Sequence, residues 1–233
     1  MAVYTRINQN DLSLIEKDFK IGKIVSFSGI KKGIENTNYL IKTNKKKIIL
    51  TIFEKRVQKK DLPFFMDLMF GLSKNRIKCP EPIKNKKGKY LFKIKSKTAC
   101  LVSFLEGKDK NQLTNKDCFQ VGKNAALLHL AAKKLRLYRK NSLSVNSWGP
   151  LLNRIDKRIN KLSNNLIKTM KTDLIDIKKK WPKNMPNGII HSDLFIDNIF
   201  FYKKKYYGFI DFYFSANDFL AYELATCVNA LCF

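Results

Sequence analysis

The polar side chains best suited to chemistry lie in one short stretch, IIHSDLFIDNIFF, at positions 189–201. Asp193 and Asn198 stand five residues apart between apolar segments, and Asp211 follows thirteen residues after Asn198. The segment between them, IFFYKKKYYGFI, is long enough for two short strands around a lysine-rich turn. Antiparallel pairing brings the two ends of such a hairpin together. We therefore expect Asn198 and Asp211 to be neighbours, with Asp193 on the loop that enters the hairpin.

One carboxylate and one amide oxygen that converge on a point suit a hard divalent ion. Mg²⁺ prefers oxygen ligands and takes one or two protein groups together with substrate phosphates. A further carboxylate beside it can accept the proton of an alcohol nucleophile. The spacing H-x-D-x-x-x-x-N followed by an aspartate is typical of phosphoryl transfer from ATP to a hydroxyl. The alternative is that these are ordinary turn residues. In the catalytic interpretation, His191 and Asp197 are expected to brace the loop.

The first half of the chain is predicted to be rich in strands. Residues 21–53 favour strands, and residues 61–75, DLPFFMDLMFGLSKN, predict a helix that Asp61 caps. One face of this helix carries apolar residues that we expect to face the core: Leu62, Phe65, Met66, Met69 and Leu72. A hairpin is predicted next, with NKKGKY (85–90) as its turn and LFKIKSKTACLVSFLEG (91–107) carrying its strands.

The second half is predicted to be mostly helical. Residues 113–135 predict a helix that starts with a capping box formed by Thr114 and Asp117. Residues 151–179 predict a second long helix, and residues 216–233 predict a last one. This last helix meets no glycine, proline or polar cap, so we expect the sequence to be incomplete at its C-terminus. A ligand is expected between the two halves.

Composition narrows the class of protein. The chain has 233 residues, 45% of them hydrophobic, so we expect a globular protein of one large domain or two lobes. Its apolar runs are too short to span a membrane, and its five cysteines lack metal-ligand spacing, which favours free thiols in the cytoplasm. The net charge of +27 comes almost entirely from lysines spread along the chain. Nucleic-acid binding sites favour arginine and exposed aromatic residues, so we expect no nucleic-acid partner.

Several segments together carry a family resemblance. The hairpin stretch, with FSGIKKGIENTNYLI, ILTIFEKR, VSFLEG and NSLSVNSWGPL in order, resembles the aminoglycoside phosphotransferase and choline kinase superfamily, and within it the bacterial homoserine kinases. This resemblance implies an α+β, two-lobed fold similar to that of protein kinases. Residues 1–105 would form the β-rich nucleotide-binding lobe, and residues 106–233 the helical lobe with the catalytic hairpin. It implies ATP-dependent phosphorylation of L-homoserine with Mg²⁺, a step toward threonine.

The resemblance also implies a role for each site residue. Asp193 would be the catalytic base, and Asn198 and Asp211 the Mg²⁺ ligands. The loop GIKKGIENTN (29–38) would cover the phosphates of ATP, and the segment SFLEG (103–107) would be the hinge that holds adenine. The residues expected to contact ATP are therefore Gly29, Gly33, Asn36, Asn38, Thr51, Phe104 and Glu106.

The sequence departs from the kinase pattern at one important point. Thr51 stands where kinases place a phosphate-binding lysine on the third strand, so the phosphate-binding cation is unassigned among Lys32, Lys55 and Arg56. Ser192 replaces the usual glycine or alanine before the base. Two alternatives stay open. One is a kinase of another small alcohol, such as an aminoglycoside or choline. The other is a catalytically silent kinase-like module that binds through its basic surface.

Overall fold

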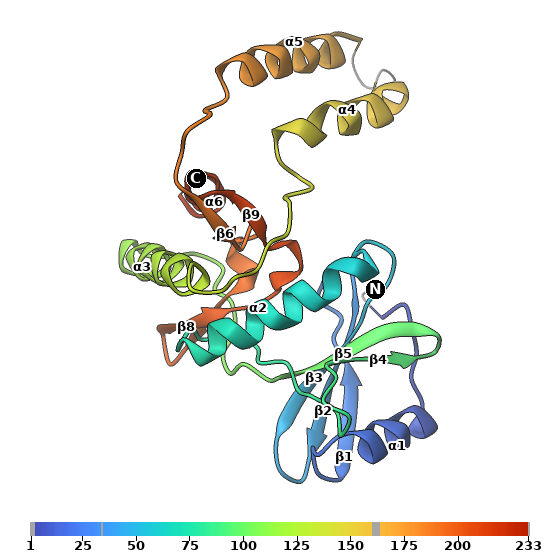
Figure 1. Cartoon of the computed structure of the whole chain (residues 1–233). Coiled ribbons are helices and arrows are strands. Elements are labelled where there is room, and N and C mark those ends of the chain that lie inside the picture. The colour runs from blue at the N-terminus through green and yellow to red at the C-terminus, as the bar shows by residue number, and fades with distance from the viewer. Residues whose placement is uncertain (1–2, 34, 160–163, 233) are drawn as a thin grey trace.

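The computed structural model describes residues 3–33, 35–159 and 164–232, and over these residues the N-terminal lobe contains a five-stranded antiparallel sheet (Figure 1). The strand order is β1-β2-β3-β5-β4. The strands are β1 (Ile24–Gly29), β2 (Thr37–Thr43), β3 (Lys47–Ile52), β4 (Leu91–Ile94) and β5 (Lys97–Ser103). The strands predicted within residues 21–53 are confirmed.

Alternation along the strands gives this sheet two apolar faces. Leu50 and Leu101 point into a core shared with helix α1 (Gln9–Asp18), because successive side chains of a strand point to opposite faces. Cys100 and Val102 point the other way, toward helix α2 (Leu62–Lys74). A capping box between Asn8 and Asp11 starts α1, a helix that the sequence analysis did not predict.

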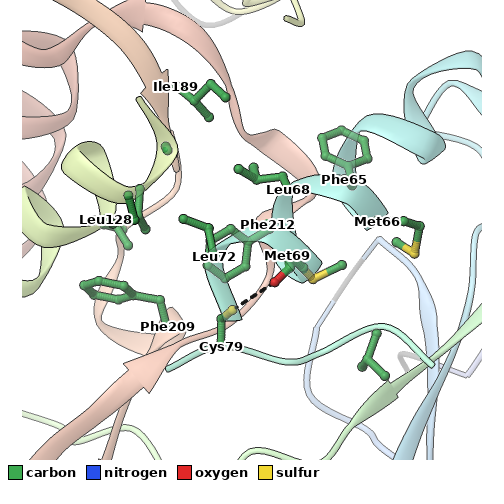
Figure 2. Close-up of a cluster of buried hydrophobic side chains, with 14 of the residues drawn as sticks. Phe65, Met66, Leu68, Met69, Leu72, Cys79, Leu128, Ile189, Phe209 and Phe212 are labelled. Atoms are coloured by element: carbon green, nitrogen blue, oxygen red, sulfur yellow. Dashed lines mark hydrogen bonds between the residues drawn. The ribbon is translucent and has the colours of Figure 1, made fainter. Parts of the chain in front are cut away.

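Helix α2 links the two lobes through a continuous apolar core. Its predicted stripe is confirmed, since all five residues are buried, together with Leu68. Figure 2 shows side chains of α2 meeting residues of the helical lobe, among them Leu128, Ile189, Phe209 and Phe212. The predicted cap is wrong. Asp61 makes no capping bond and instead accepts a hydrogen bond from Nε of Arg139 at 2.8 Å, which ties the start of α2 to the other lobe.

The tight turn of the β4–β5 hairpin also differs from the prediction. It lies at Lys95 and Ser96, which both have positive φ, and not in the segment NKKGKY. That segment forms a separate turn before β4, in which the Gly88 amide donates to the Asn85 carbonyl. Glycine and asparagine marked a turn correctly, but pairing of β4 with β5 decided which turn closes the hairpin.

The C-terminal lobe surrounds the hairpin with helices and a second small sheet. Its elements include α3 (Asn115–Ala132), β6 (Asn187–Ile190), β7 (Ile199–Tyr202), β8 (Lys205–Phe209), β9 (Ala216–Phe219) and α6 (Leu220–Leu231), with one-turn helices at Ile196–Asn198 and Phe212–Phe214. A further one-turn helix, Lys59–Asp61, precedes α2 in the N-terminal lobe. The capping box of Thr114 and Asp117 and the β7–β8 hairpin are confirmed. The last helix begins at Leu220 and not at Ala216, because residues 216–219 pair with β6 as a strand. Residue 233 lies outside the described residues.

The predicted helix over residues 151–179 is two helices in the structure, α4 (Val145–Ile159) and α5 (Asn164–Lys180). They lie side by side (Figure 1), and a Cβ on Gly149 would lie 3.7 Å from Cδ2 of Leu174. A single straight helix cannot make this contact. The predicted residues 160–163 lie outside the described part of the chain. Neither α4, α5 nor another described helix is long and apolar enough to cross a membrane.

Candidate active site

The cleft between the two lobes holds a cavity of about 530 Å³, a size typical of small-molecule sites. We call the wall formed by β2, β3, β5 and the loop that joins β1 to β2 the upper wall, and the wall formed by the loops on either side of the β7–β8 hairpin the lower wall. Of the predicted site residues, those that line it are Gly33, Asn36, Asn38, Thr51, Phe104, Asp193, Asp197, Asn198 and Asp211. Gly29, Glu106 and His191 do not line it.

Asp193 and Asn198 are joined directly. Nδ2 of Asn198 donates to Oδ2 and to the backbone carbonyl of Asp193, both at 2.8 Å. Asn198 is buried, and its Oδ1 makes no hydrogen bond with a described residue, so this oxygen is available to a ligand. At the far end of the hairpin, the Ile210 amide donates to the Asn198 carbonyl at 3.0 Å. This bond places Asp211 beside Asn198, which confirms the predicted neighbours.

Asp211 lies beside other acids at the wall of the cavity, where the residue is exposed although protein atoms crowd around its carboxyl group. Burial raises the pKa of Asp211 to about 7, with smaller contributions from the nearby carboxylates of Asp193 and Glu35. Burial also raises the pKa of Asp193, although its hydrogen bond from Asn198 acts in the opposite direction. Asp211 has φ of 64°, a left-handed conformation that is rare for residues other than glycine and is found at functional sites. A cation beside these carboxylates would relieve their mutual repulsion.

The donor set fits a magnesium ion that completes its coordination with ligands from outside the protein. Among the described residues, no group of three histidine, cysteine, aspartate or glutamate side chains is placed to hold a metal ion. Asp211 and the free Oδ1 of Asn198 instead offer one carboxylate and one amide oxygen at the same cavity. Mg²⁺ sites commonly have this composition, with water and phosphate oxygens in the remaining positions.

A buried glutamate holds the loop that carries Asp193. Glu223 in α6 is 1% exposed and accepts hydrogen bonds from the backbone amides of His191 and Ser192. Ser192 has φ of 69°, so these bonds hold a strained backbone next to the predicted base. The sequence analysis missed Glu223. A lone glutamate in the apolar run AYELATC was the available signal, since an unpaired charge in a core is costly.

The two residues predicted to brace this loop behave differently. The ring of His191 is fully buried, and its Nε2 donates to the Ile210 carbonyl at 2.9 Å. This bond links the loop that carries Asp193 to the segment before Asp211. Burial lowers the pKa of His191, which keeps the ring neutral near pH 7. Asp197 is exposed to the cavity, and its carboxylate makes no hydrogen bond with a described residue. The structure therefore lends support to a bracing role only for His191.

The upper wall contains the glycine-bearing loop. Gly33 has φ of 98°, and no atom lies within 4 Å of the position of a Cβ, so a ligand can approach its backbone closely. Asn36 and Asn38 also line the cavity, and Oδ1 of Asn38 accepts the Thr51 hydroxyl at 2.8 Å. Gly29 has a different environment. A Cβ there would lie 2.8 Å from Cγ2 of Val3, so packing against the N-terminal segment accounts for this glycine.

The predicted hinge lies at one end of the cavity. Ser103, Phe104 and Leu105 line it, whereas the Glu106 side chain points elsewhere and forms an ion pair with Lys47 at 3.3 Å. Further apolar residues that line the same cavity are Ile30, Ile49, Met69, Val102, Phe200 and Ile210. A role of the Phe104–Glu106 backbone in binding adenine stays a prediction.

A β-sheet lobe and a helical lobe that enclose two aspartates and an asparagine at one cavity are typical of the class of kinase-fold phosphotransferases. The model of the phosphotransferase enzyme family matches residues 26–233. The chain therefore belongs to the phosphotransferase enzyme family, and its curated relatives place it among the homoserine kinases of that family. The predicted α+β, two-lobed fold is confirmed.

The sequence similarity to curated relatives extends over the whole chain. The homoserine kinase of Allorhizobium ampelinum is 43% identical over 233 residues, and that of Bartonella henselae is 42% identical over 233 residues. The chain spans 73% of the length of each. Among solved structures, spectinomycin phosphotransferase in complex with ADP and spectinomycin matches with a TM-score of 0.66 at 16% identity, covering 94% of this chain and 73% of that one. An amicoumacin kinase in complex with AMP-PNP and Ca²⁺ matches with a TM-score of 0.67 at 14% identity, covering 96% of this chain and 69% of that one. These two structures support the fold alone.

Proposed function

We propose that the chain transfers a phosphoryl group from ATP to the hydroxyl of L-homoserine and yields O-phospho-L-homoserine, as a step in threonine biosynthesis. The observation that carries this proposal is the 43% identity with a homoserine kinase across all 233 residues. Asp193, Asn198 and Asp211 meet at one cavity of suitable size, which agrees with the proposed reaction.

Asp193 is the proposed base. Its carboxylate lies at the cavity and accepts the proton of the acceptor hydroxyl as that oxygen attacks the terminal phosphorus of ATP. The hydrogen bond from Nδ2 of Asn198 fixes one of its oxygens, and the other is left to contact the hydroxyl. Glu223 and His191 act as positioning residues, because they hold the backbone on both sides of the base.

Asn198 and Asp211 are the proposed magnesium ligands. Oδ1 of Asn198 and the carboxylate of Asp211 would hold the ion, which would supply electrostatic stabilisation of the phosphoryl group during transfer. The raised pKa of Asp211, about 7, falls when a cation binds beside it, so the carboxylate is ionised in the loaded site.

The nucleotide is proposed to lie along the upper wall. Gly33 and Asn36 approach the phosphates through the loop, and the backbone of Phe104 and its neighbours binds adenine at the hinge. In this arrangement residues 1–105 form the nucleotide-binding lobe, and residues 106–233 form the lobe with the catalytic hairpin. Thr51 contributes to this wall through its bond to Asn38.

The test is a coupled assay of ADP release with L-homoserine, choline, an aminoglycoside and methylthioribose as acceptors, followed by mass spectrometry of the product. Turnover of homoserine above the other alcohols supports the proposal. Turnover of another alcohol, with none of homoserine, would assign a different substrate to the same catalytic machinery. Nucleic-acid binding near physiological ionic strength without turnover of an acceptor would support the silent-module alternative.

We also propose a cytoplasmic location. All five cysteines are free, and Cys79 and Cys100 are buried with their thiol pKa values raised to about 12 by burial. Thiols of this kind are inert packing groups that agree with a reducing compartment. Alkylation of the protein taken directly from cells, before and after reduction, measures whether the five thiols are free there.

A further inference from the structure

The point on β3 where kinases place a phosphate-binding lysine is occupied by a neutral residue. Thr51 is 2% exposed, and its hydroxyl bonds Asn38, so neither side chain supplies positive charge to the cavity. Charge on the triphosphate grows toward the leaving oxygens during transfer, and preorganised cations are a main source of catalysis at such sites. The proposed kinase reaction therefore requires that another part of the chain supply this cation.

Among the described residues that line the cavity, the cationic side chains are Lys32 and Arg56. Lys32 forms an ion pair with Asp109, which follows the hinge, so it lies at the mouth of the cleft. Lys55 is exposed and does not line the cavity. Arg56 differs from both because its contacts come from the two loops proposed to hold phosphate and metal.

The guanidinium of Arg56 lies between these two loops. Its Cζ is 4.8 Å from the ring centroid of Phe214, three residues after Asp211. Its Nη1 forms an ion pair with Glu35, which lies between Gly33 and Asn36 in the glycine-bearing loop. Its positive charge also acts on Asp193, whose pKa it lowers against the larger effect of burial. The guanidinium thus lies close to three parts of the proposed site: the glycine-bearing loop, the segment that follows Asp211, and Asp193.

We propose that Arg56 is the phosphate-binding cation of this enzyme and that Glu35 is its partner while the nucleotide is absent. The inference rests on the proposed kinase function, because it assigns the missing charge of that same site. A guanidinium offers a planar fork of donors that matches phosphate oxygens, so an arginine beyond the end of β3 substitutes for a lysine within it.

The ion pair with Glu35 is one that Arg56 exchanges for phosphate oxygens when the nucleotide binds. Burial raises the pKa of Glu35, and the Arg56 charge opposes that rise, so the carboxylate depends on its partner. Phosphate oxygens that enter under the loop compete with Glu35 for the same guanidinium. The ion pair is more than half exposed on the arginine side, and exposed pairs of this kind contribute little net stability. Arg56 can therefore leave Glu35, whose side chain is 18% exposed, when its new bonds to phosphate outweigh the cost of the unpaired carboxylate.

Calorimetry and initial rates on the whole protein separate the possible roles of Arg56. Binding of adenosine, ADP and AMP-PNP with Mg²⁺ is measured for the wild type and for Arg56→Gln, Arg56→Lys, Glu35→Gln and the neighbouring control Lys55→Gln. We expect Arg56→Gln to weaken AMP-PNP binding and raise KM for ATP by roughly 10- to 100-fold, the range of a charge-assisted bond, with adenosine binding unchanged. Arg56→Lys should recover part of the loss, Lys55→Gln should match the wild type, and Glu35→Gln should bind AMP-PNP as tightly as the wild type or more tightly.

Four results overturn the assignment. Unchanged AMP-PNP binding in Arg56→Gln removes it, and equal loss of adenosine and AMP-PNP shows that Arg56 only supports the fold. A rise in KM for homoserine alone shows that the guanidinium binds the acceptor carboxylate. Loss of AMP-PNP binding in Glu35→Gln shows that the ion pair shapes the loop. Failure of the proposed function looks different, because the wild type would then not phosphorylate homoserine while the nucleotide-binding measurements stay interpretable.

Discussion

The floor and the roof of the active-site cleft are held by different kinds of interaction. The floor, residues 191–198 with Asp211, is tied by hydrogen bonds to the buried groups of Glu223, His191 and Asn198. The roof, residues 30–33 with 35 and 36, has one hydrogen bond at each end, from the Glu54 amide to Asn36 and from the Ile30 amide to the Asn38 carbonyl. Between these ends it is tied by ion pairs of Lys32 with Asp109 and of Glu35 with Arg56, whose cationic side chains are more than half exposed.

This difference follows from the strength of each interaction. A buried carboxylate that loses its donors keeps the full cost of desolvation, so the floor has one stable arrangement. Exposed ion pairs are worth about 0–1 kcal/mol and exchange partners readily. The floor is therefore suited to holding the proposed base and the proposed metal ligands in place, and the ion pairs of the roof are suited to exchanging a carboxylate partner for a phosphate.

The largest expected effect comes from removing the base on the floor. Asp193→Asn should lower kcat by about 10²–10⁴-fold, because proton acceptance is lost while the amide keeps the shape of the side chain. Nucleotide binding, measured by calorimetry, should stay within about twofold of the wild type. Asp176→Asn on the exposed face of α5 is the matched control, with no expected change in kcat. Retained activity in Asp193→Asn would remove the proposed base.

A second test concerns the raised pKa of Asp211 in the floor. The pKa of Asp211 is about 7 in the folded protein and near 3.8 ordinarily, so the folded state binds more protons than the unfolded state between these values. The contribution of Asp211 to stability is therefore complete below about pH 4 and is lost as pH rises toward 7. In metal-free buffer, the free energy of unfolding of Asp211→Asn minus that of the wild type should increase with pH across this window, by less than the full pKa shift would give because Asp211 is exposed at the cavity wall.

The measurement is urea unfolding of both proteins at a series of pH values with EDTA. Because both share every other titrating group, the difference isolates Asp211. Saturating Mg²⁺ with AMP-PNP should stabilise the wild type more than the variant. A difference that is flat with pH would show that neighbouring groups do not raise the pKa of Asp211 in the folded protein.

The third test removes a hydrogen bond between Glu223 and the loop that carries Asp193. Glu223→Gln replaces one of the accepting oxygens with a donor and leaves a backbone amide of the base loop without a partner. We expect a loss of about 1–3 kcal/mol in the free energy of unfolding, with a fall in kcat because Asp193 is no longer fixed. Glu106→Gln, which alters an exposed ion pair, should change the stability by less than about 0.5 kcal/mol. Equal stabilities in chemical denaturation would contradict the distinction.

The smallest effect is expected in the roof. Gly33 and Gly88 have φ of 98° and 76°, and neither has an atom within 4 Å of an added Cβ, so alanine strains both backbones by a similar amount, about 1 kcal/mol. Gly33→Ala should raise KM for ATP several-fold with little change in melting temperature. Gly88→Ala, in an exposed turn away from the cavity, should leave KM unchanged. Identical kinetics for the two variants would show that the roof loop does not approach the nucleotide.

Much of the floor could be predicted from the sequence because its geometry is local. The hairpin that brings Asp211 to Asn198 follows from the strand pattern and the turn, and spacing along one loop sets the distance from Asp193 to Asn198. The capping box of α3 and the apolar stripe of α2 depend on neighbouring residues in the same way. Errors arose where pairing with a distant segment overrode local preference, as in β9, whose residues 216–219 join β6.

What the sequence by itself determined is the identity of the reactive groups and their order, since the residue types at 193, 198 and 211 suit one kind of chemistry. Only the tertiary structure decided which charges reach the site. Three cations were equivalent candidates in sequence, and folding brought Arg56 to Glu35 and Phe214 while it left Lys55 in solvent. It also placed Glu223 beside the loop that carries Asp193 and brought Asp211 close to other carboxylates. The physical reason is that burial and electrostatic fields depend on distances between segments far apart in the chain, which local spacing does not set.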